Sequence, residues 1–391
     1  MAIYNFGGNP LAKVYDVTGS ELSNAYDING VDIYSDGGEP VEEPFAITTK
    51  FSSYEAAIQY AYNQMMQSYD SDTSAFLLFT DPHSQLGNDN VSFLDYIGNI
   101  VDWSKVWMID LGDTVANHTP EQYLARNNPT YATMMEKMSN ASIPNNRKMF
   151  MWGNHDMAIS GESYGITDHA WLLSGYFSNS GATHYYDNDF VMVDSEHGIK
   201  YVCIGGWDYT ETTGWTHYRI NSAHMERIIE MLSVEDNYDI VLLSHIPKYR
   251  YYSYMVQYGR GTDFSNTPVI YEPFSVTDQT SLIADVSIDV LLADRNSHSS
   301  GSVIDSDGVS HDYDFTDCNG KILCGLSGHY HLDRYWYAEN GGMLEYTFDG
   351  FLYSPRPIYF GLIDKQSESL RLWKINTNNA VFAYQLPFRR M

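Results

Sequence analysis

The sequence predicts a layered α/β fold, because short apolar runs typical of buried strands alternate along the chain with segments of helical periodicity. Polar residues follow several of these runs directly, as in folds that carry functional side chains on the loops after their strands. The chain has 391 residues, of which 43% are hydrophobic, so it can bury a large core. We expect one main domain over residues 51–391 and a β-rich appendage with a linker over residues 1–50.

Residues 1–50 contain a short internal repeat. Segments 14–22 and 25–33 share the pattern Tyr-Asp-apolar-x-Gly at an offset of eleven residues. Each copy reads as a strand, a turn at glycine and a second strand, and two copies are too few for a solenoid. One interpretation is a small β appendage packed on the main domain. The other is a module that attaches the protein to a larger assembly through residues 1–40.

Three segments of the main domain have the features of helices. Residues 53–69 begin with serines that can cap a helix and place their alanines near one face. Residues 120–138 and 222–232 are the other two, and each separates strand-like runs. Residues 296–320 are rich in Ser, Asp and Gly, which predicts a loop insertion that either covers the site or extends into solvent.

Net charge and cysteine content exclude several classes of protein. A formal net charge of −28 repels nucleic-acid backbones, so we do not expect nonspecific binding to duplexes. The three cysteines include no CxxC pair and favour neither a disulfide framework nor a thiolate zinc site. No apolar run approaches the ~20 residues of a membrane span, and the N-terminus lacks the features of a secretion signal. We expect a cytoplasmic or phage-associated protein.

The clearest functional indication is that five apolar runs lead into Asp, Asn or His. The runs cover residues 75–80, 106–109, 148–151, 239–244 and 322–327. The side chains after them are Asp81 and His83, Asp113, Asn154 with His155 and Asp156, His245, and His329 with His331. Carboxylate, amide and imidazole groups bind divalent metals, and ligands bind at the carboxyl ends of strands in open α/β sheets. Any one of these residues alone would be an ordinary turn residue or loop histidine, but their joint occurrence favours a metal site.

These motifs resemble, in type and in order, the motif series of the calcineurin-like metallophosphoesterases. The resemblance rests on Asp81-x-His83, Gly112-Asp113, Gly153-Asn154-His155-Asp156, His245 and Gly328-His329-x-His331, in separate blocks over residues 75–363. It implies a four-layer αββα sandwich, to which the small N-terminal β appendage is added. Residues 1–50 also resemble the leaders of phage-encoded and gut-bacterial surface proteins. This resemblance implies that the protein comes from a phage or from a gut bacterium.

The resemblance implies a role for each matched residue. One divalent metal would be bound by Asp81, His83, His331 and Asp113, and a second by Asn154, His245, His329 and the same Asp113, which would bridge the pair. Mn, Fe, Zn and Ni all suit such mixed ligands. His155 would face the phosphate and either stabilise its charge or protonate the leaving oxygen, and Asp156 would orient that imidazole.

The expected function is hydrolysis of a phosphate mono- or diester by a metal-activated water. Whether the enzyme is a phosphatase or a phosphodiesterase stays open at this point. The alternative, from a different class, is a structural or attachment protein of a phage or cell surface whose phosphoesterase domain is incidental or degenerate. The N-terminal repeat favours that alternative, whereas the intact set of ligands argues against degeneracy.

Overall fold

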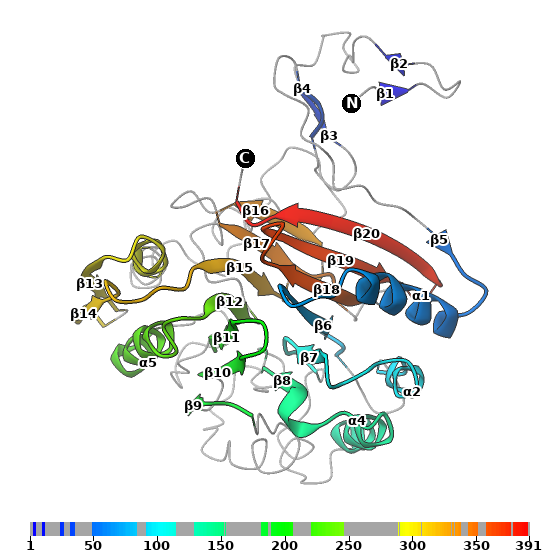
Figure 1. The fold of residues 1–391 in the computed structure, drawn as a ribbon, viewed down its shortest axis with the longest axis horizontal. Helices are drawn as coiled ribbons and strands as arrows, with labels where there is room; N and C mark the ends of the chain where they lie inside the picture. The colour runs from blue at the N-terminus through cyan, green and yellow to red at the C-terminus, as the bar shows by residue number, and fades with distance from the viewer. Residues whose placement is uncertain are drawn as a thin grey trace, which may run out of the picture.

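The protein has a mixed α/β fold built on two seven-stranded mixed sheets (Figure 1). The computed structural model describes residues 49–83, 91–114, 129–151, 153, 181–186, 189–205, 220–245, 288, 290–305, 307–329, 331, 333–337, 343–350, 357–376 and 378–389, and four short strands among residues 1–48. Within this part of the chain, no helix has both the length and the apolarity needed to cross a membrane.

The first sheet contains three of the predicted strands side by side. Its order is β5 (Thr49–Lys50), β20 (Ala380–Pro387), β19 (Ser369–Ile375), β18 (Ile358–Asp364), β6 (Thr73–Phe79), β7 (Val106–Asp110) and β8 (Lys148–Phe150). β6, β7 and β8 are parallel, and the other neighbours are antiparallel. The loops after β6 and β7 therefore leave the sheet at the same edge.

The second sheet contains the two remaining predicted strands. Its order is β16 (Arg334–Tyr337), β17 (Leu344–Thr347), β15 (Ile322–Ser327), β12 (Asp239–Ser244), β11 (Ile199–Cys203), β10 (Asp189–Asp194) and β9 (His184–Tyr186). β11, β12, β15 and β17 are parallel. Ser244 pairs with Ser327 at the ends of β12 and β15, so the residues that follow these two strands emerge together.

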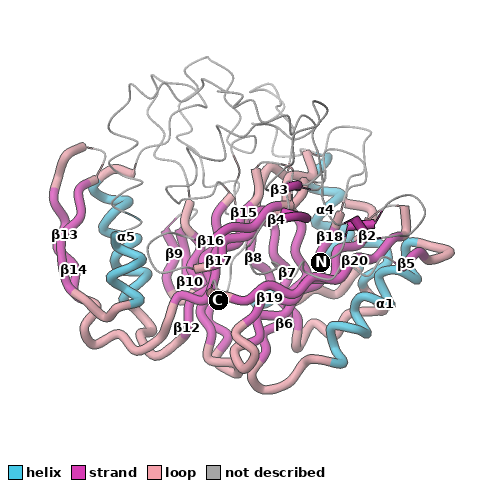
Figure 2. Tube along the Cα trace, turned by 90° about the horizontal axis from the view of Figure 1, so that it is seen from above, coloured by secondary structure: helices cyan, strands magenta, loops and turns pink. Residues whose placement is uncertain are grey.

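Helices cover the outer faces of both sheets, and the inner faces pack on each other (Figure 2). α1 (Tyr54–Gln67), α2 (Leu94–Ile97) and α4 (Pro129–Asn140) share an apolar cluster with the first sheet. α5 (Ser222–Ser233) and helical residues 290–296 share one with the second sheet. Side-chain alternation along β6 explains the layering, because Leu77 faces the helices while Leu78 faces the other sheet.

The helices begin where their capping residues stand. The amide of Ala56 donates a hydrogen bond to Ser53 Oγ (3.1 Å) at the start of α1, and the amide of His224 donates to Asn221 Oδ1 (3.0 Å) at the start of α5. The helices predicted over 53–69 and 222–232 are thus confirmed within a few residues. The third is confirmed over the described α4, and residues 120–128 lie outside the described part of the chain.

The predicted loop insertion at 296–320 contains a β-hairpin instead. β13 (Ser300–Ile304) and β14 (Ser310–Asp314) pair antiparallel on the outer side of α5 (Figures 1 and 2). Val303 and Tyr313 are buried against α5 while their neighbours are exposed. The Ser and Asp residues of the two strands occupy exposed positions, so the composition concealed an alternation with a period of two that the packing reveals.

Of the N-terminal repeat, the second copy includes a pair of strands. β3 (Asn24–Tyr26) and β4 (Asp32–Ser35) are antiparallel, as are β1 (Ile3–Tyr4) and β2 (Pro10–Leu11). Residues 14–22, the first copy, lie outside the described residues. β5 belongs to the first sheet through its pairing with β20, and the division of the chain at residue 50 stays a prediction.

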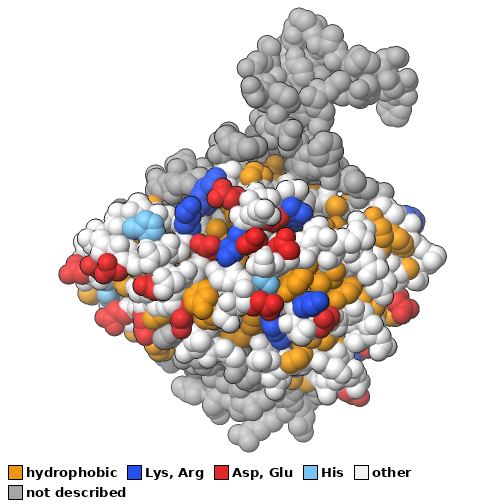
Figure 3. Space-filling model, in the orientation of Figure 1, with side chains coloured by type: hydrophobic (Ala, Val, Ile, Leu, Met, Phe, Trp, Pro, Cys, Tyr) orange, Lys and Arg blue, Asp and Glu red, His pale blue; other side chains and the backbone are white. Residues whose placement is uncertain are grey.

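Polar and charged side chains intermingle on the surface. On the face shown in Figure 3, Asp and Glu side chains stand beside Lys and Arg side chains. The three cysteines, Cys203, Cys318 and Cys324, are buried free thiols, and Cys203 and Cys324 lie inside the apolar strands β11 and β15.

Candidate metal centre

Six of the predicted ligands come together where the strands of the two sheets end. Asp81 and His83 follow β6, Asp113 follows β7, His245 follows β12, and His329 and His331 follow β15. Backbone hydrogen bonds join neighbouring loops. The amide of Asp81 donates to Gly112 O (2.8 Å), the amide of His83 to Asp113 O (2.9 Å), and the amide of Gly328 to His245 O (2.9 Å). The carboxylates therefore come from the first sheet, and three of the four imidazoles from the second.

The six side chains form two adjacent groups. Asp81, His83 and His331 are one group, and Asp113, His245 and His329 are the other; in each, the ligand atoms lie within 4.8 Å of one another. Asp81 Oδ1 is 3.5 Å from His331 Nε2. Asp113 Oδ2 lies between the groups, 3.3 Å from His245 Nε2 and 3.5 Å from His83 Nε2.

The Asp81 carboxylate fits a metal ligand. Asp81 is fully buried, and its Oδ2 accepts hydrogen bonds from Thr80 Oγ1 (2.6 Å) and the His329 amide (2.9 Å). Its Oδ1 has no hydrogen-bond partner within the described part of the chain. An unpartnered buried carboxylate oxygen is costly, and a bound cation removes that cost. The donor set of carboxylates and imidazoles suits Mn, Fe, Zn or Ni, so these residues fit a pair of divalent ions.

The orientation of His245 is fixed by the backbone of the neighbouring loop. Its Nδ1 lies 2.9 Å from Leu111 O, and because a carbonyl only accepts, Nδ1 carries the hydrogen. The lone pair is then on Nε2, the atom that faces Asp113. This is the arrangement that metal-binding histidines generally adopt.

Burial keeps two histidines of the site, His329 and His331, neutral. Burial, together with the nearby His245, lowers the pKa of His329 to about 3. Burial also lowers the pKa of His331. For Asp81, burial alone would raise the pKa, but His331 and His245 hold it well below its usual range. At neutral pH these three groups are therefore deprotonated, which is the state that binds metals.

The backbone is strained at the candidate ligands. Five of the six lie in the left-handed region, with φ of 51° at Asp81, 43° at His83, 53° at Asp113, 74° at His329 and 55° at His331. For a residue with a Cβ this conformation costs about 1 kcal/mol or more. Strain concentrated on one set of side chains indicates that their direction matters more than the stability of their loops.

Two glycines let the backbone approach the ligands closely. A Cβ at Gly153 would lie 2.0 Å from Asp113 Oδ1, and a Cβ at Gly350 would lie 2.2 Å from His331 Nδ1. Neither position has room for a side chain. Gly153 belongs to a motif found in the sequence, whereas Gly350 stands alone and no local pattern distinguished it.

Asp110 is a supporting residue that the motif analysis did not single out. Its Oδ1 accepts a hydrogen bond from the Gly112 amide (2.9 Å) and its Oδ2 from Thr114 Oγ1 (2.7 Å). It is fully buried and fixes the loop that presents Asp113. The sequence feature that could have identified Asp110 is a carboxylate at the end of an otherwise apolar strand.

The remaining predicted site residues are not placed. Asn154, His155 and Asp156 lie outside the described residues, as does Trp152; Gly153 is the described member of that stretch.

Comparison with known proteins assigns a family to the segment that contains Asp81, His83, Asp113 and His245. The family model described as calcineurin-like phosphoesterase matches residues 74–274, just over half of the chain. No curated protein matches. Among solved structures, one titled as GAP50, the anchor in the inner membrane complex of Plasmodium, is 12% identical, with a TM-score of 0.45 and coverage of 81% of this chain and 90% of that one. A structure of PhoD is 9% identical, with a TM-score of 0.46 and coverage of 81% and 70%.

Proposed function

Because the chain belongs to the calcineurin-like phosphoesterase family, we propose that it hydrolyses a phosphate mono- or diester with two divalent metal ions on a four-layer αββα framework. One observation carries the proposal. Carboxylates and imidazoles from the ends of β6, β7, β12 and β15 converge into two groups, and the buried Asp81 Oδ1 among them is left without a hydrogen-bond partner in the described part of the chain.

Each group would hold one ion. Asp81, His83 and His331 would bind the first, and His245 and His329 the second, with Asn154 as a further ligand. Asp113 would serve both, and its Oδ2 supports this role by lying within 3.5 Å of an imidazole nitrogen from each group. Gly153, whose backbone packs against Asp113, directly precedes Asn154 and supports its assignment.

Bound ions of this kind supply a nucleophilic water at neutral pH and offset the negative charge of a phosphoryl group. The chain itself supplies orientation and protons. Asp113 and Asp81 hold negative charge in a buried site, and the neutral His329 and His331 leave lone pairs for binding. His155 would donate a proton to the leaving oxygen, and Asp156 would orient its imidazole.

The test is turnover of p-nitrophenyl phosphate and bis-p-nitrophenyl phosphate by protein reconstituted with Mn²⁺. We expect metal-dependent hydrolysis of at least one ester, and the preferred ester distinguishes a phosphatase from a phosphodiesterase. Asp113→Asn should abolish it. Asp312→Asn, which changes an exposed carboxylate on the β13–β14 hairpin, should leave it unchanged. Folded protein that holds both ions and turns over neither ester would contradict the proposal and favour the attachment function.

A further inference from the structure

A cluster of two carboxylates and one lysine lies next to the Asp81–His83–His331 group. Lys374, on β19 of the first sheet, contacts Asp333 Oδ2 and lies 3.0 Å from Asp349 Oδ2. Asp333 and Asp349 flank β16 and β17 of the second sheet. Lys374 is 9% exposed, so the ion pairs are largely removed from water and join the two sheets.

Two tyrosines and the amide of Asp349 are the other partners of Asp333, and the amide donates to Oδ1 at 3.4 Å. Tyr346 Oη donates to Asp333 Oδ1 at 2.9 Å, and Tyr359 Oη donates to the same atom at 2.7 Å. The amide of Asp349 in turn lies 3.1 Å from Tyr359 Oη. Both oxygens of Asp333 are thus occupied, one by the lysine and one by the hydroxyls, which fixes this carboxylate in place.

This cluster is connected to the metal centre through two short segments. Asp333 is two residues after His331, whose backbone is held in the left-handed region at φ 55°. Asp349 directly precedes Gly350, whose Cα packs so closely on His331 that an added Cβ would lie 2.2 Å from Nδ1 and 2.9 Å from Asp81 Cβ. A shift of either carboxylate would therefore move His331.

The charge of Lys374 is what allows the two carboxylates to stay together. Burial alone would lower the pKa of Lys374, but Asp333 and Asp349 raise it above its usual value, so the amine is firmly protonated. Removing one partner from a largely buried ion cluster leaves charges that are neither solvated nor paired. Burial and the nearby Asp333 already raise the pKa of Asp349 to about 6. Without the amine, Asp333 and Asp349 would repel each other where both are ionised, and Asp349 would otherwise take up a proton, so in either case the contacts that hold them together are lost.

We propose that Lys374 is a positioning residue for the metal ion of the Asp81–His83–His331 group, which it supports by pairing with Asp333 and Asp349, the carboxylates of the two segments that adjoin His331. The inference rests on the proposed function, because it requires an ion at that group. Neither Lys374 nor Asp333 lies in a recognised motif, and their role depends on a contact between residues 41 positions apart in the chain.

The test is Mn²⁺ binding to Lys374→Met, measured by equilibrium dialysis and by electron paramagnetic resonance. Supporting residues of this kind typically change metal affinity by about 10- to 100-fold. We expect an affinity loss of that size for one of the two ions. The paramagnetic resonance spectrum of a coupled Mn²⁺ pair should then be replaced by that of a single ion. Lys374→Arg should retain the pair. Lys374→Met with Asp349→Asn should recover part of the affinity, because the repulsion is removed.

Arg371→Met is the matched control. Arg371 lies on the same strand, and its Nη2 pairs with Asp364 Oδ2 of β18 at 2.6 Å, so the substitution breaks a more exposed ion pair of the same strand away from the site. It should keep both ions. If Lys374→Met does not fold, Tyr359→Phe can be used instead. It removes one hydrogen-bond donor to Asp333 and should weaken binding of the same ion. Binding of both ions by Lys374→Met with wild-type affinity, or an equal loss in Arg371→Met, would overturn this inference and leave the proposed function intact. Wild-type protein without bound ions would overturn both.

Discussion

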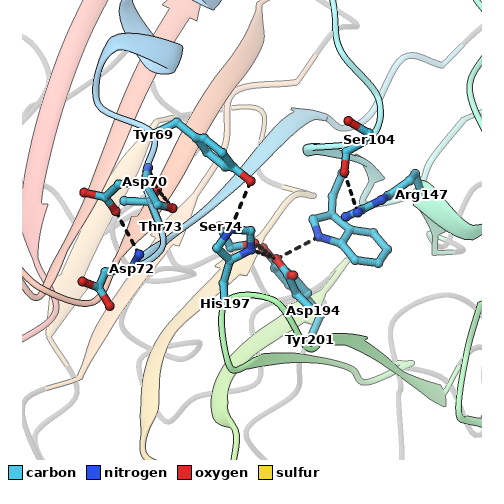
Figure 4. A network of polar contacts seen from close by, with 11 residues as sticks. Tyr69, Asp70, Asp72, Thr73, Ser74, Ser104, Arg147, Asp194, His197 and Tyr201 are labelled. Atoms are coloured by element: carbon cyan, nitrogen blue, oxygen red, sulfur yellow. Dashed lines mark hydrogen bonds and ion pairs between the residues drawn. The ribbon is translucent and has the colours of Figure 1, made fainter.

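Two buried aspartates, one near each end of β6, have opposite surroundings. Asp194 lies beside the start of β6, where its Oδ2 accepts hydrogen bonds from Ser74 Oγ (2.5 Å), Trp107 Nε1 (3.2 Å) and His197 Nδ1 (2.9 Å) (Figure 4). His197 Nε2 in turn contacts Tyr69 Oη at 3.0 Å. Asp81, after the end of β6, has two donors on Oδ2 and no hydrogen-bond partner for Oδ1 among the described residues.

The comparison separates a carboxylate whose hydrogen bonds join the two sheets from one whose surroundings fit a metal ligand. Asp194 is satisfied by groups from both sheets and sits within a regular strand. Asp81 sits on strained backbone at φ 51° and faces three histidine nitrogens within 4.0 Å. Buried polar groups are nearly always satisfied in native proteins, so an exception with metal-binding neighbours indicates function.

The largest expected effect is the loss of turnover when Asp113 at the metal centre is replaced. Asp113→Asn should lower kcat/KM by about a thousandfold or more, because one substitution would weaken the binding of both ions. The metal-free protein should be no less stable than wild type, since a buried negative charge is removed. Steady-state kinetics and urea unfolding in chelator measure the two effects. A variant that keeps wild-type turnover would contradict the bridging role.

At the other end, Asp194→Ala should destabilise the fold by about 3–5 kcal/mol, because Trp107, Ser74 and His197 lose a shared buried acceptor. The folded fraction should keep its kcat. Ser74→Ala, which removes one donor, should cost about 1 kcal/mol. Urea unfolding gives both values, and a variant that is as stable as wild type but inactive would reverse the assignment of the two aspartates.

Added metal should raise the free energy of unfolding through the metal centre, and not through the hydrogen bonds around Asp194. At one hundred times its Kd, an ion that binds the folded state alone adds about 2.7 kcal/mol to the free energy of unfolding. We expect this gain in wild type and in Ser74→Ala, and a smaller gain in Asp81→Asn. Unfolding with Mn²⁺ and with chelator gives the difference, and equal gains in wild type and Asp81→Asn would count against Asp81 as a ligand.

The pH dependence of the stability of metal-free protein should show two windows, one for each end of the comparison. The pKa of His329 falls to about 3 from an ordinary value near 6.5. Between these values the unfolded chain binds a proton that the folded chain does not, so stability should fall as pH drops through this window. Burial would raise the pKa of Asp194, but hydrogen bonds from His197 and Ser74 hold it below its usual value. Its contribution is complete above about pH 4 and is lost below it.

Urea unfolding from pH 8 to pH 3 in chelator measures both windows. Asp194→Asn should flatten the acid part of the profile and leave the decline below about pH 6.5. His329→Gln should do the reverse. Identical profiles for wild type and His329→Gln would mean that the imidazole is not buried in its neutral form.

The candidate ligands could be predicted from sequence because each stands directly after an apolar run. The positions of Asp81 and His245 depend on the apolar pattern of one strand and on where that strand ends. Both features can be read from about ten consecutive residues. The same applies to the capping residues Ser53 and Asn221. Local patterns therefore predicted five of the core strands, the helices α1 and α5, the described part of α4, and the six candidate residues that come together.

The supporting groups could not be predicted because they depend on contacts between distant residues. Ser74 reaches Asp194 across 120 positions, and Lys374 reaches Asp333 across 41. No spacing in the sequence marks such pairs, and an aspartate in a strand pattern does not reveal which side chains will surround it. The β13–β14 hairpin was missed for a related reason, since its apolar positions become meaningful only against α5.

The most direct test of the account is the number of divalent ions bound per chain, measured by mass spectrometry on protein purified without chelator and then supplied with Mn²⁺. We predict about two ions, accompanied by hydrolysis of a p-nitrophenyl ester, and fewer ions with no hydrolysis in Asp113→Asn. A folded wild-type protein that binds no ion after Mn²⁺ is restored, and that hydrolyses neither ester, would contradict it.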